Sequence, residues 1–315
     1  MDLKSKLVRT STRAFFQEAG KIPGYSLFER LHGYIYGRWI YQYIDLGVGQ
    51  HPLAKTLAPW VKKLSRFLPQ KEIPEGSSGT IADGYHGKVL PSDTAKQLVT
   101  VNQDIRIDDL EQVLPFPKAR AIILQNPEHI VALDCPCRSS RENPCTPIDV
   151  CLVVGEPFAS FVSEHHPDST RWISQAEAVD IIEAEQGRGH VSHAFFKDAM
   201  LGRFYAICNC CDCCCGAMNS HRNGTPMLAS SGYICAVDDQ ICIGCGTCQE
   251  ICQFQAVSVP DGTAVVDYEG CMGCGVCVQH CSQEALSLVR DEEKGIPLEI
   301  DRLMDMAVGN ASKLQ

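Results

Sequence analysis

Hydrophobic and polar positions in the middle of the chain predict several short strands. Residues 129–134, 190–196 and 203–208 are runs rich in apolar, β-branched and aromatic side chains, which favour extended structure. Residues 96–105 alternate apolar and polar positions and predict a further strand. Each of these runs is short, which is typical of the strands of a compact sheet.

Three other segments have the pattern of helices. Residues 173–189 place Ser174 and Glu177 at the spacing of a capping box, and their apolar positions recur on one face up to a glycine. Residues 116–127 carry a proline near the start and a second proline at the end, which predicts a helix between them. Residues 147–166 are predicted to be helical at least in part.

The N-terminal region is aromatic and amphipathic. Residues 25–49 predict one or two helices, interrupted near Gly33 and Gly37. Two interpretations of this region stay open. It is a helical lobe folded onto the rest of the protein, or it is a docking surface for a partner subunit or an anionic membrane face.

These patterns predict an α+β protein with a helical N-terminal lobe and a small α/β domain whose cysteines lie in loops at strand ends. A polar, glycine-rich stretch at residues 74–88 predicts a linker or exposed loop. The predicted parts are a basic aromatic docking segment, a cysteine-rich α/β domain, a ferredoxin-like domain and a C-terminal tail, at residues 1–70, 71–232, 233–290 and 291–315.

The cysteine content points to metal binding. The chain has 19 cysteines in 315 residues, an odd number clustered in short-spaced groups, which suits a disulfide framework poorly. Thiolate ligands survive in a reducing compartment, so the cytoplasm is the expected location. No run of 18 or more apolar residues predicts a membrane-spanning helix.

Charge is distributed unevenly along the chain. Residues 1–70 carry eleven Lys and Arg against four Asp and Glu, while the whole chain has a net charge of −10. A basic segment joined to an acidic body suggests contact with a partner protein or with the membrane surface. Nucleic-acid binding is not expected, because the protein is acidic overall and no recognition motif is present.

An internal repeat carries the most specific chemical signal. "VDDQICIGCGTCQEICQFQAVSV" aligns with "VDYEGCMGCGVCVQHCSQEALSL" at an offset of 29 residues, and each copy contains C-x2-C-x2-C-x3-C. Such spacing lets a compact loop wrap three thiolates around one cluster, and glycines let backbone amides approach the sulfides. The repeated cysteines are Cys242, Cys245, Cys248, Cys252, Cys271, Cys274, Cys277 and Cys281.

The repeat resembles the two-cluster bacterial ferredoxins over about residues 233–290. The resemblance implies two [4Fe-4S] clusters with crossed ligation, and a pseudo-twofold pair of β-α-β halves. One cluster would be held by Cys242, Cys245, Cys248 and Cys281. The other would be held by Cys252, Cys271, Cys274 and Cys277. One departure from the family is that Gln253 and Ser282 stand where proline usually follows the fourth cysteine.

Ten further cysteines form two groups upstream of the repeat. The first has the spacing C-x-C-x7-C-x5-C, and the second is "CNCCDCCC" at residues 208–215, called here the cysteine run. If the run were extended, one face would carry Cys211, Cys213 and Cys215. The opposite face would then carry Cys208, Cys210 and Cys214. A helical run would instead gather Cys208, Cys211 and Cys215.

Either conformation brings three thiols together, so a single cluster cannot readily take all six of the run. We therefore expect one or two further iron–sulfur clusters that share ligands between the two groups; zinc or a reactive-thiol site is the alternative. The candidate ligands are Cys135, Cys137, Cys145, Cys151, Cys208, Cys210, Cys211, Cys213, Cys214 and Cys215. His190 and His193 precede the run and are candidates to approach a metal or relay protons, or are ordinary strand histidines.

The order of these motifs over about residues 115–290 is similar to a group of iron–sulfur proteins from anaerobes. This resemblance implies a redox function, with redox partner proteins and a larger oxidoreductase complex as expected partners. The chain is therefore interpreted as an electron-transfer protein or subunit, located in the cytoplasm or on the membrane surface. A catalytic iron–sulfur reductase is the alternative, and a redox or metal sensor is a third.

Overall fold

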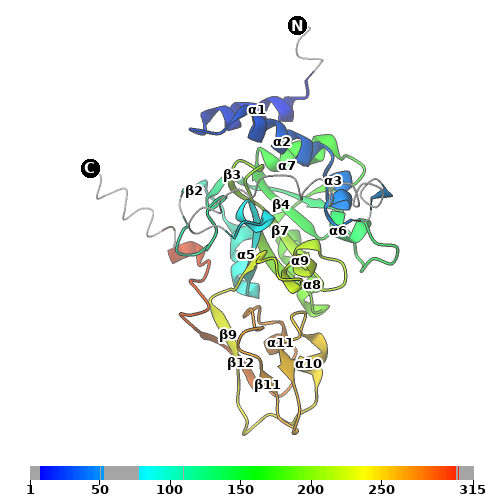
Figure 1. Cartoon of the computed structure of the whole chain (residues 1–315), viewed down its shortest axis with the longest axis vertical. Coiled ribbons are helices and arrows are strands. Elements are labelled where there is room, and N and C mark those ends of the chain that lie inside the picture. The colour runs from blue at the N-terminus through cyan, green and yellow to red at the C-terminus, as the bar shows by residue number, and fades with distance from the viewer. Residues whose placement is uncertain (1–7, 50, 53–77, 109, 303, 305–315) are drawn as a thin grey trace, which may run out of the picture.

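The computed structural model describes the chain except for residues 1–7, 50, 53–77, 109, 303 and 305–315. Three parts follow one another along the long axis of the molecule (Figure 1). The N-terminal helices lie at one end, the central sheet lies in the middle, and the cysteine repeat lies at the other end. In the part of the chain that is described, no helix is long and apolar enough to cross a membrane.

The central sheet has eight strands in the order β2-β3-β4-β7-β6-β1-β8, with β5 paired to β3. Neighbouring strands run antiparallel except for the β1–β8 pair. The strands are β1 (Tyr85–Leu90), β2 (Ile105–Ile107), β3 (Ile122–Leu133), β4 (Cys151–Glu156), β5 (Thr170–Ile173), β6 (Val191–Lys197), β7 (Arg203–Cys210) and β8 (Leu228–Ala229). The mixture of helix and strand agrees with an α+β protein, but this sheet is not the parallel sheet of a strict α/β domain.

Helices pack around this sheet and build a continuous core with it. Residues from α5, α7 and α8 are buried with β3, β4, β6 and β7 in one apolar cluster. The helices of the central part are α5 (Ser92–Thr100), α6 (Pro136–Ser139), α7 (Phe158–His165), α8 (Gln175–Gly187) and α9 (Gly216–Arg222), with a 3-10 turn η3 at Ile81–Asp83.

The N-terminal region forms three helices, α1 (Thr10–Lys21), α2 (Leu27–Arg38) and α3 (Ile40–Gly47). Helix α2 begins at a complete capping box between Ser26 and Glu29. The break between helices comes at Trp39, not at Gly33 and Gly37 as predicted. Both glycines instead allow close packing: a Cβ on Gly33 would collide with the Ala199 carbonyl oxygen, and one on Gly37 with the Phe161 ring.

The cysteine repeat folds into two symmetric halves. Its elements are β9 (Tyr233–Val237), α10 (Thr247–Ile251), β10 (Val257–Ser258), β11 (Val265–Val266), α11 (Val276–Gln279) and β12 (Leu286–Arg290). Strand β9 before the first set of four cysteines pairs with β12 after the second set, and β10 after the first set pairs with β11 before the second. This exchange of strands matches the pseudo-twofold arrangement implied by the ferredoxin resemblance.

Two predicted elements are wrong. Residues 116–127 were predicted as a helix, but Ile122–Leu133 forms β3, because pairing with strands on both sides outweighs the local proline signals. Pro127 is accommodated next to Asn126, which has φ of 47°, where the register with β4 shifts. Residues 96–105 were predicted as a strand, but Ser92–Thr100 forms α5 with its buried side chains at helical spacing.

Other predictions agree with the structure. The strands at 190–196 and 203–208 are confirmed as β6 and β7, and 129–134 is the end of β3. Residues 147–166 are helical only in part, since β4 comes first and gives way to α7 at Pro157. Ser174 caps α8 by accepting a hydrogen bond from the Glu177 backbone N–H at 3.2 Å. The predicted linker at 74–88 lies partly outside the described residues, and its end is already part of β1.

Candidate metal centres

The first ferredoxin set consists of the four cysteines expected from crossed ligation. Residues from both copies of the repeat line one pocket, and among them are Cys242, Cys245, Cys248 and Cys281. Cys242 and Cys245 lie in the loop before α10, Cys248 lies in the first turn of α10, and Cys281 follows α11. The two halves of the repeat are therefore folded so that each can supply the last ligand of the other.

The second ferredoxin set is Cys252 with Cys271, Cys274 and Cys277. Burial, followed by the nearby thiols of the other three members, raises the pKa of Cys274. Burial also raises the pKa of Cys252, which lies close to Cys277 and Cys271. Crowded, buried thiols of this kind ionise readily only when a metal cation compensates the charge.

The backbone around both sets fits iron–sulfur clusters. The amide of Ala264 donates to the Cys242 sulfur at 3.4 Å, and the amide of Ala256 donates to the Cys252 sulfur at 3.3 Å. Gly244 and Gly273 both have φ of +64°, and a Cβ on either would collide with a backbone carbonyl oxygen. Amide donors to sulfur and glycines beside the ligands are the features that tune and accommodate such clusters.

Six upstream cysteines, four of them buried and two partly buried, form a chain of contacting thiols, called here the six-thiol chain. Neighbouring sulfurs interact pairwise, and at one end of the chain the sulfurs of Cys215 and Cys210 are 3.3 Å apart. The contact with Cys137 and burial raise the pKa of Cys135 to about 12. In contact order, the chain is Cys208, Cys151, Cys135, Cys137, Cys215 and Cys210.

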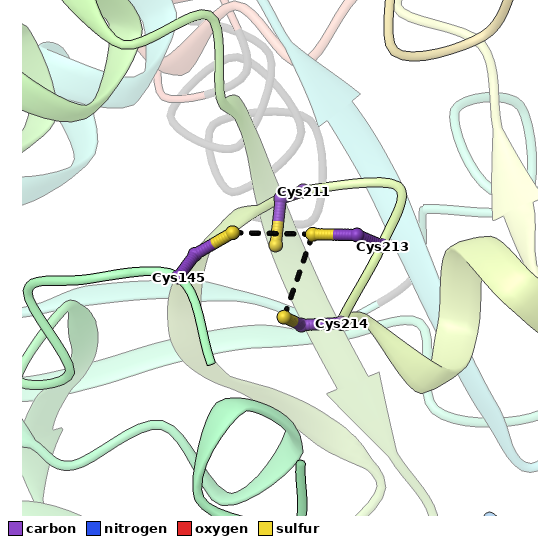
Figure 2. Close-up of side chains that lie close together, drawn as sticks. All are labelled: Cys145, Cys211, Cys213 and Cys214. Carbon is purple, nitrogen blue, oxygen red and sulfur yellow. Dashed lines mark hydrogen bonds between the residues drawn. The ribbon is translucent and has the colours of Figure 1, made fainter. Parts of the chain in front are cut away.

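The other four upstream cysteines form a separate four-thiol group, shown in Figure 2. Their sulfur atoms all lie within 4.8 Å of one another. The sulfur of Cys213 lies 3.1 Å from that of Cys145 and 3.5 Å from that of Cys214. Burial raises the pKa of Cys211 and of Cys213 to about 12. The members are Cys145, Cys211, Cys213 and Cys214.

The cysteine run is neither extended nor helical throughout. Strand β7 ends at Cys210, the chain turns over residues 212–214, and α9 begins at Gly216. Because of this turn, Cys214 joins Cys211 and Cys213, whereas Cys215 joins Cys208 and Cys210. The prediction for an extended run therefore placed four of the six cysteines in the correct group and exchanged Cys214 with Cys215. The prediction for a helical run is also wrong.

A buried ion pair fixes the loop that carries Cys135 and Cys137. Arg138 donates to the Glu185 carboxylate at 2.6 Å and to the Asn209 carbonyl oxygen at 3.0 Å. Burial alone would raise the pKa of Glu185, but hydrogen bonds from His190 and Arg138 hold it below its usual value. One arginine thus connects the first cysteine group to β7 and α8, a role that the sequence pattern did not reveal.

The predicted histidines contact protein groups. His190 Nδ1 lies 2.7 Å from Glu185, and His193 Nδ1 lies 3.1 Å from the Val191 carbonyl oxygen. Burial lowers the pKa of His193 to about 4, so its ring is neutral. Neither contact indicates a metal ligand. His190 instead contacts Glu185, the carboxylate that pairs with Arg138.

The ferredoxin part touches the cysteine run directly. The side-chain oxygen of Gln253 accepts a hydrogen bond from the Asp212 N–H at 2.8 Å. Gln253 is the residue that replaces the usual proline, so this departure from the family pattern makes a contact between the two cysteine regions. Cys235 was not a predicted ligand, and its sulfur lies 3.6 Å from that of Cys277.

Comparison with known proteins identifies one domain. The model of a 4Fe-4S dicluster domain matches residues 241–286, which contain both ferredoxin sets. No curated protein and no solved structure matches the chain.

Proposed function

We propose that the protein is an iron–sulfur electron-transfer protein, or a subunit of a larger redox complex. The dicluster domain and the many cysteines suggest iron–sulfur electron transfer in general terms. The observation that carries the proposal is the pocket that gathers Cys242, Cys245 and Cys248 of the first repeat copy with Cys281 of the second. A bound [4Fe-4S] cluster supplies a one-electron carrier at each set.

One or two further clusters belong to the upstream cysteines in this proposal. The six-thiol chain has more than the four thiols that a cubane requires. Four of its members are buried, and all six line one apolar cavity. Arg138 and Asn209 hold the loops that present these thiols. The chain therefore supplies a rigid, largely water-free ligand set.

The docking of the domains favours a direction for the relay. The second ferredoxin set lies on the side of the central domain, since Cys274 and Phe254 pack against its core and Gln253 contacts the cysteine run. The first set lies away from it, where Cys245 is exposed and Ile243 is 63% exposed. We infer that the second set faces the upstream site and that the first set faces an external redox partner.

The N-terminal helices provide a second contact surface in this proposal. Helix α2 packs Tyr36 inward but leaves apolar side chains on its outer face, and Leu27 and Phe28 are each 76% exposed. A basic region with exposed apolar side chains suits a partner subunit of a larger oxidoreductase complex or the cytoplasmic membrane surface. Substituting Phe28→Asp and Leu31→Asp should weaken that association and leave the iron content unchanged.

Anaerobic iron and sulfide quantitation with an EPR redox titration tests the proposal. The wild type should contain more than about eight iron atoms, the number that two cubanes hold. Cys137→Ser tests the six-thiol chain, and Cys211→Ser tests the four-thiol group. Cys242→Ser, in the first ferredoxin set, is the control that should remove iron without touching the upstream cysteines. If neither Cys137→Ser nor Cys211→Ser removed iron or a signal, the upstream site would not be a cluster.

A catalytic reductase is a second candidate, favoured by one groove. Residues from α3, β1 and α9 line a groove that reaches Cys137, and Lys197 and Tyr85 line it as well. A small molecule in this groove would lie beside the six-thiol chain and near a buried cation. A change of the EPR spectrum on adding an oxidised substrate would support this candidate over pure electron relay.

A further inference from the structure

The four-thiol group differs in geometry from the two ferredoxin sets. Its four sulfurs all lie within 4.8 Å of one another. The structure describes all eight repeat cysteines. Among the described residues, however, no other group of three or more Cys, His, Asp or Glu side chains has its ligand atoms this close together. The sulfur atoms of the four-thiol group are therefore closer to one another than those of either ferredoxin set.

We propose that Cys145, Cys211, Cys213 and Cys214 hold one divalent metal ion, zinc or iron(II), in a tetrahedral tetrathiolate site. Four sulfurs at about 2.3 Å from a single ion lie about 3.8 Å from one another, by the geometry of a tetrahedron. The observed separations of 3.1 and 3.5 Å, and the upper limit of 4.8 Å, surround this value. The thiolates of a cubane bind four different iron atoms and must lie farther apart.

The local fold supports a closed structural site. Three ligands come from one tight turn between β7 and α9, and Cys145 approaches from the loop between α6 and β4 (Figure 2). Cys211 and Cys214 are buried, whereas Cys213 is exposed. Arg141 donates to the Cys214 carbonyl oxygen at 3.0 Å, which fixes the turn and places a positive charge beside a site of net negative charge.

The position of the site explains what the ion would do. Cys145 lies between Cys137 and Cys151 in the sequence, and the turn lies between Cys210 and Cys215. An ion at the four-thiol group would therefore join the two loops that carry most of the six-thiol chain. The assignment refines the upstream site of the proposed function to one structural ion beside one cluster-binding chain, but it does not depend on electron transfer.

Elemental analysis and X-ray absorption of protein purified anaerobically test the assignment. The double variant Cys211→Ala/Cys213→Ala should lose one zinc or one iron atom per chain and no acid-labile sulfide. Cys242→Ala, in the first ferredoxin set, is the matched control and should lose iron together with sulfide. At the edge of the lost metal, the wild type should show four sulfur neighbours at about 2.3 Å.

Three results would overturn the assignment. The double variant could lose about four iron atoms and an equal amount of sulfide, which is the signature of a cubane. It could lose no metal at all. Mass spectrometry after thiol alkylation could show a disulfide among the four cysteines of the wild type. If the ferredoxin sets hold no clusters, Cys242→Ala will lose neither iron nor sulfide. Failure of the proposed function can therefore be told apart from failure of this assignment. If the variant does not fold, the zinc-edge absorption of the wild type decides the case for zinc, and an excess of one iron atom over acid-labile sulfide decides it for iron, because cubanes hold equal amounts of both.

Discussion

Removing one partner of the buried Arg138–Glu185 pair should strongly destabilise the fold around the central sheet. Both side chains are only 1% exposed, and their charged atoms lie 2.6 Å apart. In Arg138→Met, the Glu185 carboxylate keeps His190 and the half-exposed Arg188 but loses its fully buried positive partner. Breaking a buried ion pair costs about 3–5 kcal/mol, because the remaining buried charge is poorly compensated.

Thermal unfolding measured anaerobically at one fixed scan rate would detect this loss. For a domain of this size, 1 kcal/mol shifts the melting temperature by about 2–4 °C, so Arg138→Met should melt about 6–20 °C lower. Arg171→Met is the matched control, because Arg171 is 44% exposed and pairs with Asp149 and Glu177 at the surface. An exposed pair is worth at most about 1 kcal/mol, so this variant should melt within a few degrees of wild type.

The double variant Arg138→Met/Glu185→Met separates the ion pair from simple packing. Removing both buried charges leaves no uncompensated carboxylate, and the double variant should therefore recover much of the stability lost in Arg138→Met. Equal melting temperatures for Arg138→Met and Arg171→Met would refute the reasoning. A double variant less stable than either single variant would show that the hydrogen bonds of Arg138 matter more than its charge.

Three further predictions concern other parts of the fold. Burial lowers the pKa of Lys88 to about 7, so the cost of its charge is absent near pH 11 and grows as the pH falls. Wild type should lose stability relative to Lys88→Met between about pH 10 and 7, by at most about 5 kcal/mol, and parallel denaturation profiles would contradict this. Gly33→Ala should destabilise the N-terminal helices by about 1–3 kcal/mol, because its Cβ meets backbone. Gly20→Ala is the control and should stabilise by about 0.5–1 kcal/mol, because its Cβ would find its nearest neighbour 3.8 Å away. Gln253→Pro should remove the acceptor for the turn of the cysteine run and speed amide exchange there about fivefold, as expected for a bond worth about 1 kcal/mol. Ser282→Pro, at the corresponding position of the second repeat, should leave that exchange unchanged.

The elements that were predicted correctly have local causes. Helix α8 begins where the Ser174 side chain caps it and ends at Gly187. The two halves of the cysteine repeat were predicted from cysteines and glycines that lie close together in the sequence. By contrast, part of β3 was predicted as a helix because the strands that pair with it, β2 and β4, lie outside the stretch of sequence on which that prediction was based. The packing of Gly33 against Ala199 depends on a contact across the fold and leaves no local signal.

The upstream cysteines show the same limit for a candidate site. Their residue types and numbers predicted metal binding, but the division into six and four could not be read from spacing. Arg138 was missed because an arginine beside two cysteines has no distinctive local pattern, whereas its buried partner Glu185 lies on another element. His190 was considered as a candidate for approaching a metal, but its contact is with that same carboxylate.

Strand register explains why the two upstream groups differ in how they are built. Cys151 on β4 is the direct partner of Cys208 on β7, so the sheet itself sets part of the six-thiol chain. A slip of one residue would turn Cys208 and Cys210 to the other face and dismantle that chain. The four-thiol group has no such support, since its ligands lie in a turn and a loop. Strand pairing should thus preserve the Cys151–Cys208 contact without metal, whereas the four-thiol group should depend on its ion. Chelation should accordingly raise amide exchange at residues 141–147 and 211–214 before it affects β4 and β7.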